Sequence, residues 1–226
     1  MQVLLQNMLS LEMRVQDRYK YYKWKRIMSV NKIEKTMIGV EGHITIWDPE
    51  NGDVFTRRRN AINFENMSVA LANLLANEAG ATGSHHIGTM KFGNAGTTID
   101  GVGAVTYKAT NTTLSTGALY NQTFSKAVDE AVTGSALNSV EVSHTATNLF
   151  SDVIVTCTLD YGEPSGQDAT DTATNMDGTY VFDELALYSA NDDLLTHVIF
   201  HPVQKSANRK IQVIYTLRLR TSYSDV

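Results

Sequence analysis

The sequence has few of the residues that cross-link or rigidify a small exported protein, with one cysteine and three prolines among 226 residues. A single cysteine cannot form an internal disulfide, so we expect the fold to depend on a hydrophobic core, which a chain of this length can bury. Cys157 lies in the apolar run VIVTCTLDY, which predicts a buried structural thiol rather than a nucleophile. One cysteine also suits assembly in a reducing cytoplasm.

The chain also lacks a continuous apolar run of membrane-spanning length, and its opening residues lack the charge pattern and cleavage site of a secretory signal. We therefore expect a soluble product with no membrane span.

Charge is uneven along the chain. Residues 1–28 hold six Lys and Arg against two acids, a net charge of +4, which leaves −9 for the rest of a chain whose total is −5. An acidic body argues against a specific nucleic-acid partner.

The first 28 residues form a basic segment with a rough helical stripe of apolar side chains, which predicts an N-terminal helical arm preceding one domain, residues 29–226. Three interpretations stay open. The arm docks on a partner subunit, it contacts a membrane surface or nucleic acid, or it is an upstream extension of the reading frame. Met28 would then be the ordinary start of a compact β-domain.

The last third of the chain contains three strand-like segments, VFDELALYS, HVIFHPVQKS and KIQVIYTLRLRTS. The third alternates with a period of two, which is typical of a half-buried strand. These segments predict a mainly β fold, an antiparallel β-sandwich of jelly-roll-like form. The residues expected on the buried face of the last segment are Ile211, Val213, Tyr215, Leu217 and Leu219.

Two local patterns predict structure before the last third. Asn51-Gly52 between two β-prone runs indicates a hairpin with a two-residue primed turn, which needs positive φ at both positions. NFENMSVALANLLANEAG predicts one short helix that ends near Gly80. The stretch from Gly162 to Gly178 has almost no apolar residue and predicts a surface loop.

No pattern in the sequence indicates a metal or a cofactor. His85 and His86 are adjacent, so on a strand they would point to opposite faces and would not form a joint metal site. The acidic residues of the surface loop could collect calcium, but their spacing fails as an EF-hand loop, and a solvated acidic loop is favoured. The acidic residues and the amide concerned are Asp168, Asp171, Asp177 and Asn175.

Catalytic patterns are equally weak. The glycines of FGNAGTT and DGVGAV lack the Lys-Ser/Thr ending of a nucleotide-binding loop, and we attribute them to turns. No GxSxG elbow occurs. Asp183 and Glu184 are neighbours on a predicted strand and would face opposite ways, which makes them a poor pair of catalytic carboxylates. We expect no enzymatic activity.

The basic cluster of the body is Arg57, Arg58 and Arg59. On a strand Arg57 and Arg59 share one face and Arg58 takes the other. Two hypotheses carry equal weight: a subunit contact in which arginine pairs with a carboxylate of the next copy, and an ordinary solvated face.

Three segments in this order resemble those of small virion structural proteins of tailed bacteriophages: RNAINFENMSVALANLL, then IGTMKFGNAGTT, then the stretch from VFDELALYS to IYTLRL. The similarity covers roughly residues 38–222. The matching positions are Asn60, Phe92-Gly93, Glu184 with Leu185 and Leu187, Pro202 to Lys205, and Ile211 to Leu219.

The resemblance implies a non-enzymatic structural component that connects or attaches tail, neck, collar, baseplate or fibre parts in the virion after assembly in the host cytoplasm. Its expected partners are other virion proteins and further copies of itself, in a ring or trimer. Glu184 and Lys205 are then expected to form a structural pair that fixes the closing strands.

The alternative is a carbohydrate- or receptor-binding β-sandwich at a fibre tip. Glycan sites favour exposed aromatic residues on loops. The aromatic residues considered lie in predicted strands, which favours the connector: Trp47, Phe55, Phe182, Tyr188, Phe200 and Tyr215.

Overall fold

The computed structural model describes residues 35–80, 83–129, 137–167 and 179–224. The chain divides into a compact unit, Ile38–Arg220, and a second unit of residues 1–37 and 221–226, of which only the strand ends 35–37 and 221–224 are described. The predicted arm, residues 1–28, therefore lies outside the described residues. So do the acidic-loop residues Asp168, Asp171, Asn175 and Asp177.

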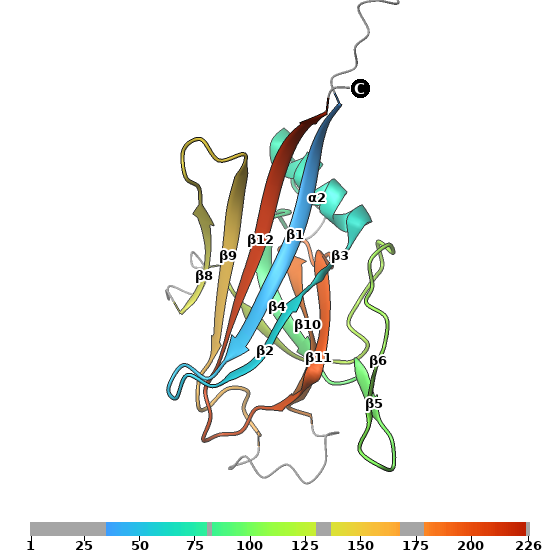
Figure 1. The fold of residues 1–226 in the computed structure, drawn as a ribbon, viewed down its shortest axis with the longest axis vertical. Helices are drawn as coiled ribbons and strands as arrows, with labels where there is room; N and C mark the ends of the chain where they lie inside the picture. The colour runs from blue at the N-terminus through green and yellow to red at the C-terminus, as the bar shows by residue number, and fades with distance from the viewer. Residues whose placement is uncertain (1–34, 81–82, 130–136, 168–178, 225–226) are drawn as a thin grey trace, which may run out of the picture. The chain divides into compact units, whose positions relative to one another are not determined.

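In its described residues the compact unit is a sandwich of two five-stranded antiparallel sheets with one short helix (Figure 1), which confirms the predicted fold class. The first sheet has the order β2 (Val54–Arg59), β1 (Lys35–Trp47), β12 (Ile211–Ser224), β9 (Phe150–Leu159), β8 (Asn138–Ser143). The second has the order β3 (Ala61–Ile62), β11 (Thr196–Gln204), β10 (Val181–Ser189), β4 (Ile87–Gly93), β7 (Gln122–Ala127). A small ribbon pairs β5 (Thr97–Ile99) with β6 (Val105–Tyr107), and the helix α2 spans Phe64–Ala76. No helix in the described ranges is both long and apolar enough to cross a membrane.

The predicted alternation of β12 is confirmed for Ile211, Val213, Tyr215 and Leu217, which are buried in the main core between the sheets. The fifth predicted residue, Leu219, is only half-buried near the end of the strand. The three closing segments do not lie side by side, however. β10 pairs with β11 in one sheet, whereas β12 lies between β1 and β9 in the other. Alternation predicts which face of a strand is buried, but it does not predict the neighbouring strand.

The hairpin between β1 and β2 is confirmed, but its turn is longer than predicted. Only Gly52 has a positive φ, 82°. The Gly52 N–H donates to the Asp48 carbonyl at 2.9 Å, and the Asp48 N–H donates to the Asp53 carbonyl at 2.8 Å. The Asp48 carboxylate also accepts from the Glu50 N–H, so side-chain capping stabilises a wider turn than the two-residue turn expected for Asn-Gly.

Helix α2 begins where predicted and ends earlier. The Asn63 side chain accepts from the Asn66 N–H at the start of the helix. The helix stops at Ala76 because Asn77 takes the left-handed conformation, φ 55°, and its N–H donates to the Leu74 carbonyl. Asn77 thus ends the helix three residues before Gly80, where the end was predicted.

Asn60 carries the chain from the first sheet to the second, between β2 and β3. Its N–H donates to the Gly42 carbonyl at 3.2 Å, and its side chain packs where a Cβ on Gly42 would lie. Because β2 and β3 belong to different sheets, this crossing closes part of one lateral side of the sandwich.

Candidate functional site

The three arginines of β2 lie on two faces of an edge strand, as predicted. Arg57 and Arg59 pair with Thr45 and His43 on the outer face of the first sheet, and all three arginines are exposed. Arg58 pairs with the buried Ile44 and therefore points toward the second sheet. In the described part of the chain none of the three forms an ion pair with a carboxylate, so the choice between subunit contact and solvated face stays open.

Arg58 bridges the two sheets at this edge. Its Nη1 donates to the Ile199 carbonyl of β11 at 3.2 Å, and its guanidinium carbon lies 4.7 Å from the centroid of the Tyr107 ring. A guanidinium held by a carbonyl and an aromatic face loses less entropy when it binds an anion than a mobile side chain does. Arg58 is therefore the best-positioned cation of the cluster.

A groove of about 500 Å³ opens beside Arg58, between the β2–β3 crossing, β11 and the segment that follows β6. We call it the cationic groove. Two further cations line it, Arg59 and Lys108, and the Lys108 ammonium lies 4.5 Å from the centroid of the Tyr120 ring. The lining residues are Arg58, Arg59, Asn60, Ala61, Tyr107, Lys108, Ala109, Thr110, Thr112, Val198 and Ile199.

The far wall of the groove is held by a buried polar cluster. The Asn111 N–H donates to His197 Nδ1 at 3.0 Å, so this nitrogen carries no proton, and His197 Nε2 donates to the Glu184 carboxylate at 3.0 Å. Glu184 also accepts from the N–H groups of Tyr120 and Asn121, at 3.0 and 2.9 Å. His197 and Glu184 are both fully buried. Burial alone would raise the pKa of Glu184, but these hydrogen bonds outweigh it and hold that pKa below its ordinary value.

Asp183 holds the adjacent turn in the same way. Its carboxylate accepts from the N–H groups of Gly96 and Thr97 and from the Thr97 hydroxyl. Here burial is the larger effect and raises the pKa of Asp183, although these hydrogen bonds oppose it. The Gly96 carbonyl in turn accepts from the Lys108 N–H at 2.9 Å. The two neighbouring acids of β10, a poor catalytic pair by sequence, thus act together in positioning loops.

The structure does not bring Glu184 and Lys205 together, and the predicted structural pair is corrected. Glu184 is satisfied by His197 and two backbone N–H groups, whereas Lys205 donates to the Gln167 side chain at 2.8 Å and to the Ser206 carbonyl at 2.9 Å. Lys205 is 1% exposed, and burial lowers its pKa from the ordinary 10.5 to about 8. The two residues lie at different positions along the paired strands, because Glu184 is opposite Ile199 whereas the Lys205 N–H donates to the Tyr180 carbonyl.

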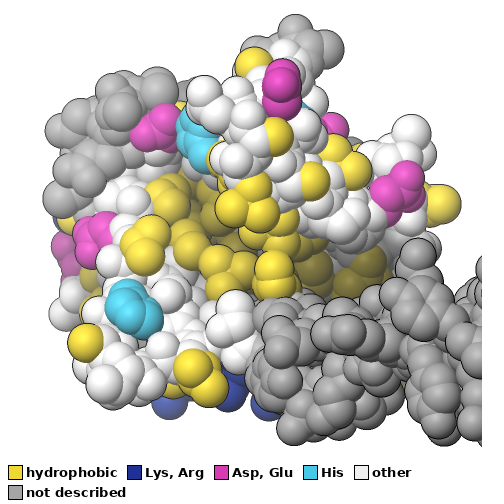
Figure 2. Space-filling view, turned by 90° about the horizontal axis from the view of Figure 1, so that it is seen from above, with side chains coloured by type: hydrophobic (Ala, Val, Ile, Leu, Met, Phe, Trp, Pro, Cys, Tyr) yellow, Lys and Arg dark blue, Asp and Glu magenta, His cyan; other side chains and the backbone are white. Residues whose placement is uncertain are grey.

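One end of the sandwich exposes apolar side chains. Figure 2 shows them gathered in a hollow, seen from above in the orientation of Figure 1. Ile38, Leu74 and Val142 are 57%, 48% and 73% exposed. They continue the inner face of β1, the apolar stripe of α2 and the inner face of β8. Val40, Leu71 and Val153 pack against the core beneath them. We call these six residues the apolar end.

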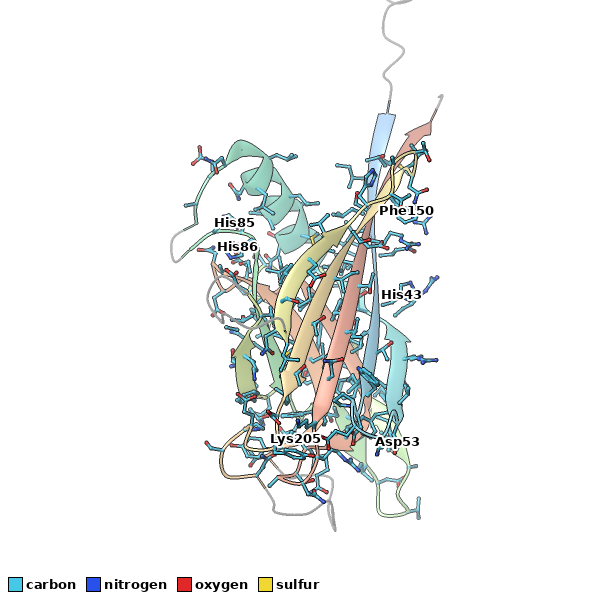
Figure 3. All side chains as sticks on the ribbon, turned by 90° about the vertical axis from the view of Figure 1, so that its left-hand side faces the viewer. His43, Asp53, His85, His86, Phe150 and Lys205 are labelled. Atoms are coloured by element: carbon cyan, nitrogen blue, oxygen red, sulfur yellow. The ribbon has the colours of Figure 1, made fainter. Side chains whose placement is uncertain are left out.

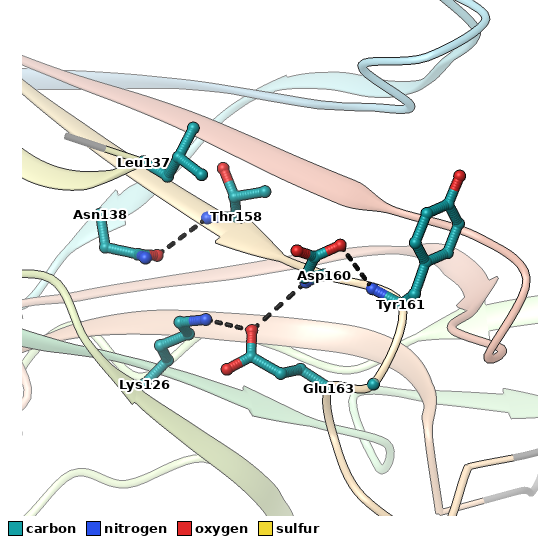
Figure 4. A pocket seen from close by; sticks show the side chains of 8 residues that line it. Lys126, Leu137, Asn138, Thr158, Asp160, Tyr161 and Glu163 are labelled. Carbon is teal, nitrogen blue, oxygen red and sulfur yellow. Dashed lines mark hydrogen bonds and ion pairs between the residues drawn. The ribbon is translucent and has the colours of Figure 1, made fainter. Parts of the chain in front are cut away.

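A second pocket, of about 560 Å³, lies on the other lateral side, beside β7 and β8 (Figure 4). Here Lys126 and Glu163 form an ion pair, and the Glu163 carboxylate also accepts from the Asp160 N–H. The Asn138 side chain accepts from the Thr158 N–H at 3.0 Å. Because its lysine is neutralised by a lining carboxylate, this pocket has less attraction for an anion than the cationic groove.

The histidines do not collect into a site. His85 and His86 lie just before β4, and each faces a different carboxylate: Asp193 at 3.7 Å and Asp129 at 3.1 Å. Figure 3 shows this pair and Lys205 at opposite ends of the sandwich. Among the described residues no group of three or more His, Cys, Asp or Glu could hold a metal ion. Cys157 is fully buried in the core, and burial raises the pKa of its thiol to about 12.

Sequence reasoning singled out the arginines but missed the groove beside them. Tyr107, Lys108 and Tyr120 lie in a Thr- and Asn-rich stretch that predicts short strands joined by surface loops, and their approach to β2 depends on buried hydrogen bonds to β10 and β11. Comparison of the chain with protein-family models, with curated proteins and with solved structures finds no match.

Proposed function

We propose that this chain is a non-enzymatic structural subunit of a tailed-phage virion, which connects or attaches tail, neck or fibre parts by assembling with neighbouring copies and other virion proteins. The observation that carries the proposal is the apolar end, where a closed core continues into exposed Ile38, Leu74 and Val142. Contiguous apolar surface of this kind marks an interaction site in a soluble protein.

The sheet edges support the same proposal. Among the described strands, β2 and β8 each pair on one side only within the first sheet, and unpaired edges are covered by neighbours in symmetric assemblies. β8 carries Val142 on its inner face, so one neighbour can cover both this edge and the apolar end. The exposed Arg57 of β2 offers a pairing partner for a carboxylate of another copy.

Light scattering on the full-length chain tests the proposal. The wild-type chain is expected to have a mass several times its 24.9 kDa, as in a ring or trimer. Val142→Lys and Leu74→Lys each bury an unpaired charge in the proposed contact and are expected to shift the mass toward the monomer. Val102→Lys is the matched control, since Val102 is 89% exposed in the β5–β6 turn.

Circular dichroism melts of all three variants check that each remains folded. A wild-type monomer, or variants that assemble like the wild type, would contradict assembly through the apolar end. Such results would shift weight to the alternative, a carbohydrate- or receptor-binding sandwich at a fibre tip. One observation favours that alternative: Tyr107 and Tyr120, 40% and 43% exposed, line or flank the cationic groove rather than the core.

A further inference from the structure

The cationic groove carries uncompensated positive charge. Arg58 and Lys108 line it with cationic side chains, a third lining residue, Arg59, directs its side chain to the outer face of β2, and none of the described lining residues is acidic. In the described part of the chain no carboxylate forms an ion pair with any of the three. On the outer face of β1, Glu41 has a lowered pKa, mainly through its hydrogen bond with Arg220 and to a smaller degree through Arg59. The Glu184 carboxylate lies buried behind the groove wall, where it accepts from the Tyr120 N–H and from His197. Clustered cations in a concave site raise the local concentration of anions.

The groove is built to hold its cations in place. Arg58 rests on Tyr107 and on the Ile199 carbonyl, and Lys108 lies over Tyr120. The Tyr120 hydroxyl donates to the Ala109 carbonyl at 2.7 Å, and this hydrogen bond connects the two ends of the segment 109–120. Together with the buried contact between Asn111 and His197, these bonds preorganise the groove before any ligand arrives.

The chemistry of the lining selects the kind of anion. The planar guanidinium of Arg58 matches a carboxylate, to which it can donate two parallel hydrogen bonds. The hydroxyls of Thr110 and Thr112 both donate and accept, as a ligand rich in hydroxyl groups requires. Tyr107 adds an exposed aromatic surface for the apolar face of a sugar ring. A volume of about 500 Å³ lies within the range of small-ligand sites.

We propose that the cationic groove binds the carboxylate of an acidic sugar, with Arg58 as the carboxylate-binding residue and Lys108 as the supporting cation. An acidic peptide is disfavoured, because an extended peptide would place its charges along β2, where the arginines do not share one face. Arg57 and Arg59 point to the outer face, and Arg58 points into the groove. This inference does not depend on assembly of the chain.

Calorimetric titration of the full-length chain with glucuronate and with glucose tests the proposal, because the two sugars differ by one carboxylate. Glucuronate is expected to bind at least about tenfold more tightly than glucose, since a charge-assisted hydrogen bond is worth roughly that factor. Raising the salt concentration is expected to weaken glucuronate binding. An acetylated tetraglutamate peptide is titrated in parallel.

The variants separate the groove from the surrounding charge. Arg58→Ala is expected to weaken glucuronate binding about tenfold or more. Lys108→Gln tests the same site and leaves the inter-sheet contact of Arg58 intact, so it serves if Arg58→Ala fails to fold. Arg57→Gln removes an equal charge from the same strand outside the groove and is expected to leave binding unchanged.

Three results would overturn the proposal: equal binding of glucose and glucuronate, tighter binding of the peptide than of the sugar, or no glucuronate binding at millimolar concentration. Equal losses in Arg57→Gln and Lys108→Gln would also overturn it, because general charge would then explain the binding. None of these results bears on the mass measured by light scattering, so the two proposals fail independently.

Discussion

Lys205 is a buried lysine, and its effect on stability can be worked out from the structure. Its ammonium donates to Gln167 and to the Ser206 carbonyl, and in the described residues it has no ion pair with a carboxylate. Burial lowers its pKa from 10.5 to about 8. Between these values the unfolded chain binds a proton that the folded chain lacks, so the free energy of unfolding rises with pH in this window. A shift of this size corresponds to about 3 kcal/mol.

Lys205→Met removes the titration and keeps most of the apolar volume. It also leaves two oxygen acceptors without a donor, at a cost of about 1–3 kcal/mol that does not depend on pH. Near pH 7.5 the variant gains stability because no charge is buried and loses stability because two acceptors are unpaired. The sign of the net change in unfolding free energy is therefore not the test. The difference in unfolding free energy, wild type minus variant, is expected to grow by about 3 kcal/mol up to pH 10.5.

Urea unfolding followed by circular dichroism, at several pH values in this window, measures that difference. Tyr188, whose pKa burial raises to about 12, also affects stability in alkali, but it is common to both proteins and cancels. Lys108→Met serves as a control, because Lys108 is exposed. A wild-type minus Lys205→Met difference that stays constant with pH would refute the burial argument.

Two substitutions and one labelling experiment test the core. His197→Ala leaves the buried Glu184 carboxylate without its side-chain donor and is expected to cost about 3–5 kcal/mol in urea unfolding, whereas a loss below about 1 kcal/mol would show that the cluster is not structural. Gly93→Ala would place a Cβ 2.5 Å from the Asn121 carbonyl oxygen, with an expected loss of about 1–3 kcal/mol; Gly39→Ala, which meets nothing within 4 Å, is the control and should be near neutral. The Cys157 thiol is expected to react with Ellman's reagent only after unfolding, because it is buried and its pKa is raised to about 12; rapid labelling of the folded chain would contradict this.

The parts of the fold that follow from local pattern could be predicted from the sequence. Alternation predicted most of the buried face of β12, and the apolar stripe of the segment that begins at Asn63 predicted helix α2. The position of β12 between β1 and β9 could not be predicted, because a strand with one apolar face fits any sheet that needs that face. The end of α2 was misplaced because asparagine, rather than glycine, takes the left-handed position.

The glycines after β4 show a related limit. FGNAG was attributed to a turn, but the structure requires Gly93 and Gly96 for close packing. A Cβ on Gly93 would lie 2.6 Å from the Glu184 carboxylate, and one on Gly96 would lie 3.0 Å from the Glu184 side chain. The sequence shows a glycine, but it does not show what approaches it. Only the fold reveals that both glycines make room for the same buried acid.

Glu184 therefore connects the core to the candidate site. Its hydrogen bonds hold Tyr120 and Asn121 directly and Asn111 through His197, and this segment forms the wall on which Lys108 lies. A buried carboxylate surrounded by donors does not neutralise the groove by an ion pair. It fixes the position of the wall that carries a cation of the groove. This explains how an acidic body can present a local positive surface. The acids are satisfied inside by backbone N–H groups, and Arg58 and Lys108 are left to face a ligand.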